Sequence, residues 1–500
     1  MLLRQDGPSG PAARDGLKPS PTGAAALDVV RGRNMRAMKK VLLTICIAAL
    51  ASAAVVFSQT RGAAPVVYAG ARILVGDGAV VESGAFVVEN GRITGVGPID
   101  RADAMAPRGA ARVDLAGRTV MPAMVNAHVH IGYEGYTSWG AENHTPENVV
   151  DHLQREAYYG VGASQSVGSS PVEQSLQIQK DQQAGRLPPA ARYFFMPGMA
   201  PPNGGPDAVL RVATTKLHVI NEVSTPAEAR AAVQRMAARK IPQVKLWYDD
   251  RRGTYPKLTP ETMAAIIDEA HKHRMLVNAH ATTLPDQKAV VRAGADVLVH
   301  MVQGEQIDDE LVAILREKKP YWATVIGLGD RPGICSGDPF FEETVPAGVV
   351  QTIRGTTEAR PLAASCGPPS PNAARREEIL AYNFPRMIAA GVRLVLGTDT
   401  GIHPGHTFGT GDHVEIARWV QLGLAPRDAI VAATSTPAKL LGIGDMGTIA
   451  AGRSADFVVL DANPLEDIHN TRKISAVYLR GQKLDRAALL AKWQHRSTAP

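Results

Sequence analysis

The sequence has few cysteines, few aromatic residues and little net charge outside its first segment. Of 500 residues, three are cysteines and 5% are aromatic. No two cysteines have C-x-x-C spacing, which excludes a cysteine-ligated zinc site. No glycine-rich phosphate loop follows an early strand, which disfavours a nucleotide-binding doubly wound sheet. The net charge is +6, and residues 1–60 hold eight basic against three acidic residues, so the remaining chain gives no case for nucleic acid binding.

Residues 1–60 have the pattern of a disordered extension followed by an export signal. An uncharged apolar run of 17 residues, 41–57, follows a basic flank and contains small residues typical of a cleavage site. This pattern predicts a periplasmic or secreted protein, with an uncleaved inner-membrane anchor as the alternative. Residues 1–34 are rich in Pro, Gly, Ala and Arg and precede two further methionines, which leaves open whether they are translated.

Only Cys335 and Cys366 remain after this leader. An oxidising compartment would permit a disulfide between them. Two unrelated buried thiols are the equal alternative, and the sequence leaves both open.

Short β-type segments occur at both ends of the mature chain. Residues 64–120 alternate such segments with turn signals, and Asn90 and Gly91 form a strong hairpin signal. Residues 443–485 show a similar pattern of short β-type segments and turn signals. We expect the two ends to form one small β-sandwich that encloses a central domain of residues 121–442.

The central domain alternates strand-like and helix-like segments, which predicts an α/β fold. Helical patterns cover 226–239, 260–273, 308–318 and 375–390, and a long Gly/Pro-rich segment, 328–373, is either a lid or an insertion. A (β/α)8 TIM barrel is favoured over an open doubly wound sheet. The eight strand candidates are 121–130, 161–167, 192–196, 243–247, 275–280, 295–300, 321–325 and 393–398.

Side chains that bind metals lie at the ends of five of these strands. Functional groups of a parallel barrel gather at the C-terminal ends of its strands. Residues two apart on a strand share a face, so His128 and His130 on the first strand point to the same side. Together the ends predict a metal site. They carry His128 and His130, then Lys245, His280, His300 and Asp399.

These residues and their surroundings resemble the amidohydrolase superfamily, in its imidazolonepropionase/prolidase-like branch. The resemblance extends over residues 64–485. It is carried by VMPAMVNAHVH, IPQVKLW, LVNAHATT, GADVLVH, LGTDTG and the late segment APRDAIVAATSTPAKLLGIGDMGTIAAGRSADFVVLDANPL. It implies a metal-dependent hydrolase that acts on carbon–nitrogen bonds.

The resemblance also implies a role for each strand-end residue. His128, His130 and Asp399 would hold one divalent ion, and His280 and His300 would hold a second. Lys245 would be carboxylated by CO2, and its carbamate would bridge both ions. Zinc is the metal we expect from imidazole-rich ligation, although manganese, cobalt or iron would fit. Asp399 would act as general base and then as general acid for a water activated by the ions.

The expected reaction is hydrolysis of an amide or peptide bond in a dipeptide or N-acyl amino acid. A cyclic amidohydrolase or a deaminase is the alternative, and Lys245 argues against the one-metal deaminase type. A non-catalytic binding barrel is the third possibility. The expected partner is a small-molecule substrate, with a membrane only if the leader is uncleaved, no nucleic acid, and a homo-oligomer left open.

Three further residues are candidates for substrate contacts. Tyr248 could stabilise an oxyanion, Arg252 could hold a carboxylate, and His403 could line the mouth of the site. An ordinary solvated charged loop is the alternative reading of the segment after Lys245. The acidic residue that the family usually carries after the second strand is absent, since residues 167–170 read Val-Gly-Ser-Ser.

Overall fold

The structure is a computed structural model that describes residues 64–330, 333–355, 366, 371–403 and 406–497. The predicted extension and export signal of residues 1–60 lie outside this part of the chain. Among the described residues, no helix has both the length and the apolar character that crossing a membrane requires.

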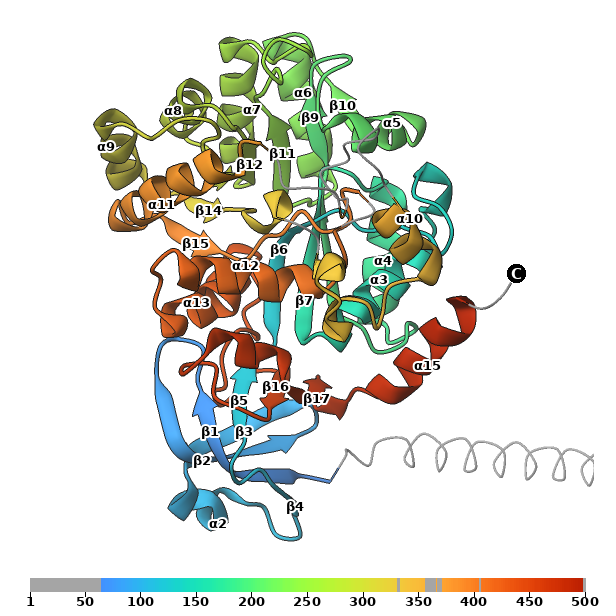
Figure 1. The fold of residues 1–500 in the computed structure, drawn as a ribbon, viewed down its shortest axis with the longest axis vertical. Coiled ribbons are helices and arrows are strands. Elements are labelled where there is room, and N and C mark those ends of the chain that lie inside the picture. The colour runs from blue at the N-terminus through green and yellow to red at the C-terminus, as the bar shows by residue number, and fades with distance from the viewer. Residues whose placement is uncertain (1–63, 331–332, 356–365, 367–370, 404–405, 498–500) are drawn as a thin grey trace, which may run out of the picture. The chain divides into compact units, whose positions relative to one another are not determined.

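Strands from both ends of the chain form one eight-stranded sheet (Figure 1). Its order is β18-β17-β16-β5-β1-β2-β3, with β4 also paired to β1. Antiparallel pairing of β16 with β5 joins the two ends of the chain, and it places Phe457 opposite Pro122. The strands are β1 (Val66–Leu74), β2 (Val80–Glu89), β3 (Arg92–Pro98), β4 (Ala111–Asp114), β5 (Thr119–Pro122), β16 (Phe457–Leu460), β17 (Ile474–Leu479) and β18 (Gln482–Lys483).

The hairpin predicted at Asn90 and Gly91 is confirmed. β2 and β3 pair antiparallel on either side of these two residues. Both have positive φ, 51° and 75°. Positive φ at both central residues is the conformation that makes Asn-Gly the preferred two-residue hairpin turn. Short helical segments follow this hairpin, η1 (Ile99–Arg101) and α2 (Ala102–Met105).

Two further sheets are entirely parallel, which confirms the α/β class. The three-stranded sheet has the order β6-β7-β8, and the seven-stranded sheet has the order β10-β9-β11-β12-β13-β14-β15. The strands are β6 (Met124–Val129), β7 (Val161–Val167), β8 (Arg192–Met196), β9 (Gly198–Ala200), β10 (Ile220–Glu222), β11 (Gln243–Trp247), β12 (Leu276–His280), β13 (Val297–Val299), β14 (Tyr321–Ala323) and β15 (Arg393–Val395).

The apolar run at 121–130 is two strands, not the single strand that we expected. β5 ends at Pro122 and β6 begins at Met124, in different sheets. The two are separated at Ala123, whose N–H bonds to the carbonyl of Asp456. The boundary of the central domain therefore falls after Pro122. Three-residue strands β9 and β10 were also not expected.

Helices follow most of the parallel strands, and several begin at a threonine cap. Thr145, Thr225, Thr259 and Thr283 each accept a hydrogen bond from a first-turn N–H, with proline in that turn. The predicted helices are present with ends shifted by one or two residues. The helices are α3 (Pro146–Tyr158), α4 (Val172–Gln183), α5 (Ala208–Lys216), α6 (Pro226–Ala238), α7 (Pro260–Lys272), α8 (Leu284–Ala293), α9 (Asp309–Lys318), α11 (Ala373–Ala389), α12 (Thr410–Gln421), α13 (Pro426–Ala433), α14 (Ser435–Leu440) and α15 (Arg486–Ser497).

The segment between β14 and α11 has local structure and its own apolar cluster. It contains η3 (Gly327–Gly329), η4 (Gly333–Ser336), η5 (Pro339–Phe341) and α10 (Ala347–Gly355). Cys335 and Cys366 form a disulfide, which settles the choice that the sequence left open. Their side chains pack against a cluster formed by Ile334, Phe341, Val345, Val349 and Ile353. The remaining short helices are η2 (Ala141–Asn143) and η6 (Ile468–Arg472).

Candidate metal centre

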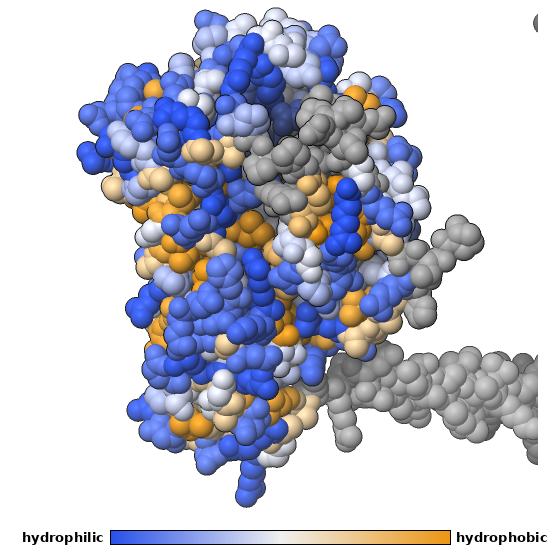
Figure 2. Space-filling model, in the orientation of Figure 1, coloured by the Kyte–Doolittle hydropathy of each residue, from blue (hydrophilic) through white to orange (hydrophobic). Residues whose placement is uncertain are grey.

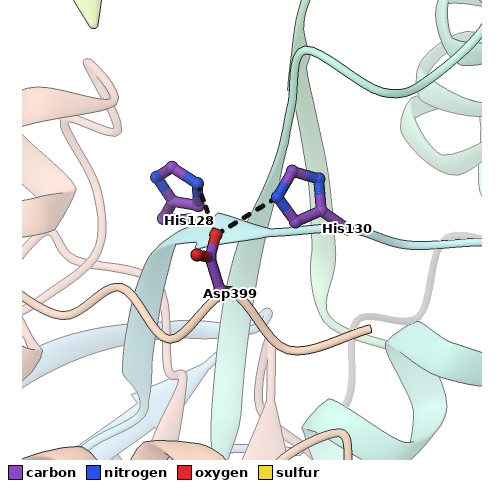
Figure 3. Close-up of side chains that lie close together, drawn as sticks. All are labelled: His128, His130 and Asp399. Carbon is purple, nitrogen blue, oxygen red and sulfur yellow. Dashed lines mark hydrogen bonds and ion pairs between the residues drawn. The ribbon is translucent and has the colours of Figure 1, made fainter. Parts of the chain in front are cut away.

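His128, His130 and Asp399 meet at the end of β6. Alternation along the strand places both imidazoles on one face, while Ala127 and Val129 pack into apolar clusters. Asp399 Oδ1 lies 2.8 Å from His128 Nε2 and 3.2 Å from His130 Nε2 (Figure 3). One ligand atom from each of the three buried residues lies within 4.8 Å of the others. The three side chains therefore form a candidate group for one metal ion.

Asp399 is held in place by the backbone after β15. Its N–H and that of Thr398 both donate to the carbonyl of His128, at 3.0 Å each. Asn126, two residues before His128 on β6, donates to Thr398 Oγ1 at 2.9 Å and to Asp412 Oδ1 at 2.8 Å. Asp399 itself has φ +57°. A non-glycine residue in this left-handed region costs free energy, and such residues concentrate at functional sites.

Lys245, His280 and His300 complete the predicted set on the neighbouring strands. β11 and β12 pair in parallel register, with Trp247 of β11 opposite His280 of β12. Lys245 lies on β11, two residues before Trp247. The rings of His280 and His300 are 4.3 Å apart between centroids. His300 Nε2 lies 3.8 Å from Asp399 Oδ2. All six predicted ligands line one small cleft of about 10 Å³.

The electrostatics of the cleft favour metal binding. Burial lowers the pKa of His128 to about 4 and that of His300 to about 3, so both imidazoles are neutral with a free lone pair at neutral pH. Burial raises the pKa of Asp399, but the imidazoles of His128 and His300 outweigh it and hold that pKa well below its ordinary value. The carboxylate is therefore ionised.

Lys245 is buried, and within the described part of the chain it forms no ion pair. Burial lowers the pKa of its amine to about 7, even though the Asp399 carboxylate raises it. A buried, unpaired ammonium is unfavourable, whereas the neutral amine is a nucleophile that reacts with CO2. The residue therefore fits the predicted carbamate chemically.

The hydrogen bonds that support the candidate ligands also fit a metal site. His130 Nδ1 lies 2.8 Å from Ser169 Oγ, which leaves Nε2 for the site. Such a partner on the second ring nitrogen orients a ligand histidine. His280 differs, because its Nε2 faces Asp249 Oδ2 at 3.0 Å and also bonds to Arg251. An ion at this half of the cleft would be bound through the other ring nitrogen or after Arg251 moves.

Sequence reasoning missed two charged residues of the cleft, Arg251 and Asp207, and a third, Asp249, that pairs with Arg251. Arg251 lines the cleft, and it forms one ion pair with Asp249 and another with Asp207. Thr282 Oγ1 donates to the same Asp249 oxygen at 2.7 Å. Asp249 and Arg251 lie in the loop after β11, whose charged character was the only signal for them, whereas Asp207 lies directly before α5 and carried no signal. Sequence reasoning also missed the role of Ser169, because residues 167–170 were considered only for the acidic residue that they lack.

The three predicted substrate contacts have different positions. Tyr248 is buried away from the cleft, with the Lys257 ammonium 5.1 Å from its ring centroid. Arg252 is exposed and lines a larger cavity that His300 also lines. His403 is partly buried beside His406, with 5.5 Å between ring centroids, and does not line the ligand cleft. Only Arg252 has the exposure and position that a substrate contact requires.

Known proteins share both sequence and fold with this chain. The model of the amidohydrolase family matches residues 252–484. An ochratoxinase from Aspergillus niger is 24% identical over 481 residues, which cover 88% of this chain and 90% of that protein. The solved structure of molinate hydrolase has a TM-score of 0.67 at 22% identity, covering 86% of this chain and 96% of that one. A Xaa-Pro dipeptidase structure has a TM-score of 0.65 at 22% identity, covering 84% and 100%. The family model, these similarities and the candidate ligand set are all consistent with the amidohydrolase superfamily and with a hydrolase that acts on carbon–nitrogen bonds.

Proposed function

We propose that this protein is a metal-dependent amidohydrolase that cleaves the amide or peptide bond of a dipeptide or N-acyl amino acid. The observation that carries the proposal is the convergence of six predicted ligands on one buried cleft. His128, His130 and Asp399 would hold one divalent ion, and His280 and His300 a second, with carboxylated Lys245 between them. The names of the similar proteins, an ochratoxinase, a molinate hydrolase and a Xaa-Pro dipeptidase, support hydrolysis.

The residues of the cleft divide the reaction among them. When bound, the ions, which we expect to be zinc, supply Lewis acidity that activates water and polarises the substrate carbonyl. The ionised Asp399 accepts the proton of the attacking water as the new C–O bond forms. It then returns that proton to the nitrogen as the C–N bond breaks, which releases a carboxylate and an amine. Arg252, outside the cleft, would hold the carboxylate of the substrate.

We also propose that the parallel strands close into a (β/α)8 barrel. Hydrogen bonds from Ala127 N to Leu396 O, at 2.8 Å, and from His130 N to Thr400 O, at 2.7 Å, connect β6 to the segment after β15. The N–H of Lys245 donates to the carbonyl of Pro197 at 2.9 Å, which connects β11 to the segment between β8 and β9. These contacts support closure at both junctions between the parallel sheets.

The eight-stranded sheet, in our proposal, curls into the small sandwich. Phe86 on β2 and Phe457 on β16 are three strands apart in the sheet order. A flat sheet would separate them by about 14 Å. Their ring centroids are 5.0 Å apart, which supports a sheet folded over its own aromatic residues.

Export is a further part of the proposal. The Cys335–Cys366 disulfide supports an oxidising compartment, because such bonds are rare in the cytosol of most organisms. The apolar run at 41–57 would direct the chain there.

Metal analysis and a substrate screen test the function. The full chain, purified and loaded with zinc, should hold two ions and release free amino acid from a set of dipeptides and N-acyl amino acids. One ion per chain would favour a one-metal deaminase-like site. Absence of both bound metal and turnover would contradict the proposal.

A further inference from the structure

A second cavity adjoins the ligand cleft and has room for a substrate. The cleft between the ligands measures about 10 Å³, the space of one water molecule. The non-reacting part of any substrate must therefore lie outside it. The neighbouring cavity measures about 530 Å³, within the usual range for small-molecule sites, and His300 lines both spaces.

The walls of this second cavity are mainly apolar. They come from the segments after β13 and β14, from η3 and from α11. On the face shown in Figure 2, hydrophobic residues gather near the place that α11 and β15 have in Figure 1. Removing an apolar group from water into such walls is favourable. The apolar lining residues are Met301, Val302, Val325, Ile326, Leu328, Ile379 and Leu380.

Three arginines but no acidic residue line the same cavity. Arg375 pairs with Glu378 at 3.0 Å, and Arg376 pairs with Asp330 at 2.9 Å. Arg252 is exposed and has no hydrogen bond or ion pair within the described part of the chain, although its φ of +60° is unfavourable for a residue with a side chain. Arg252 is thus a free guanidinium at the edge of an apolar space, suited to a carboxylate.

We propose that this cavity is the subsite for a large apolar side chain on the amino-acid leaving group of the substrate. The inference rests on the proposed function. The carboxylate of the leaving amino acid pairs with Arg252, its side chain packs against Ile326, Leu328 and Ile379, and its nitrogen lies toward His300 and the cleft. A cationic side chain is disfavoured, since the lining offers arginines and no carboxylate.

A substrate series tests this assignment. With the zinc-loaded full chain, kcat/KM should rise about 10- to 100-fold from N-acetyl-L-alanine to N-acetyl-L-phenylalanine, and N-acetyl-L-lysine should be poorer than N-acetyl-L-leucine. Leu328→Trp, which fills the cavity, should reduce the phenylalanine-to-alanine ratio to within a few-fold of one. Leu328→Ala, which removes one wall, should reduce it less. Val212→Trp is the matched control, because Val212 is 57% exposed on α5 and lines neither space.

A binding measurement provides a readout that is independent of turnover. In calorimetric titrations, L-phenylalanine should bind the zinc-loaded wild type more tightly than L-alanine. Arg252→Ala should weaken both ligands, which share the carboxylate, whereas Leu328→Trp should weaken L-phenylalanine selectively.

The two proposals fail in different ways. Hydrolysis of N-acyl amino acids with the same side-chain ratio in Leu328→Trp and wild type would overturn the subsite and leave the proposed function intact. A preference for the lysine substrate would do the same. Lack of all hydrolysis, together with selective loss of L-phenylalanine binding in Leu328→Trp, would contradict the function and support the subsite. Equal binding of both amino acids in the wild type would overturn the subsite.

Discussion

His130 and Asp399 are 269 positions apart in the chain, yet 3.2 Å separates His130 Nε2 from Asp399 Oδ1. The contact exists because β6 is bonded to the segment after β15, so the first and last of the parallel strands supply one metal group. Every ligand in this group depends on that long-range pairing.

Asp399→Asn should lower kcat about 10²- to 10⁴-fold, because the amide cannot accept and return the proton. Steady-state kinetics with the best N-acyl amino acid would measure this. Asp428→Asn, an exposed carboxylate on α13, is the control and should be active. More than a tenth of wild-type kcat in Asp399→Asn would exclude the proton-transfer role.

Ser169→Ala should weaken zinc binding about 10- to 100-fold, since it removes the partner that orients His130. Competition against a chelator would give the affinity. Ser175→Ala is the matched control, because Ser175 is also buried but bonds to the Tyr193 hydroxyl, away from the ligands. Equal affinities in the two variants would show that Ser169 does not support the site.

The convergence of the six candidate side chains was predictable because it follows from two regular rules, alternation along strands and the gathering of functional groups at strand ends. Arg251 and Asp207 were not, because loops position both. Arg251 has φ +51°, a conformation that its sequence does not indicate, and Asp207 lies 44 positions earlier in the chain. The break at Ala123 was hidden for a related reason. β5 takes its partner from β16, more than 300 residues away, and nothing in the apolar run marks where that pairing ends.

Glu156→Gln should flatten the pH dependence of stability between about pH 4.5 and 7. Burial raises the pKa of Glu156 to about 7, with Ser164 and the Gly409 N–H as partners. In this window the folded chain keeps a proton on Glu156 that the unfolded chain loses, so the contribution of Glu156 to stability is greatest below pH 4.5 and falls by up to about 1.4 kcal/mol per pH unit as the pH rises. Denaturant unfolding at intervals across the range would measure the slope. An unchanged slope in the variant would show that Glu156 is ionised when folded.

Replacing both Cys335 and Cys366 with serine should lower the free energy of unfolding by about 3–4 kcal/mol. The disulfide closes a loop with a sequence separation of 31, and chain entropy sets the expected loss. Chemical denaturation with and without reductant would measure it. Reductant should destabilise the wild type by the same amount and leave the double variant unaffected. Equal stability of wild type and variant would remove the disulfide as support for export.

Lys245→Ala should abolish turnover, and short carboxylic acids such as acetate or propionate should partly restore it. The alanine leaves space in the cleft where Lys245 lay, and a free carboxylate supplies the two oxygens of the carbamate that we propose. Lys245→Met is the matched comparison, because its longer side chain fills that space and should prevent rescue. Metal content distinguishes the causes of any loss, since removal of a bridging ligand should reduce the bound zinc, whereas loss of a remote lysine should not. Undiminished activity in Lys245→Ala would overturn the bridging role and favour a site that works with one ion.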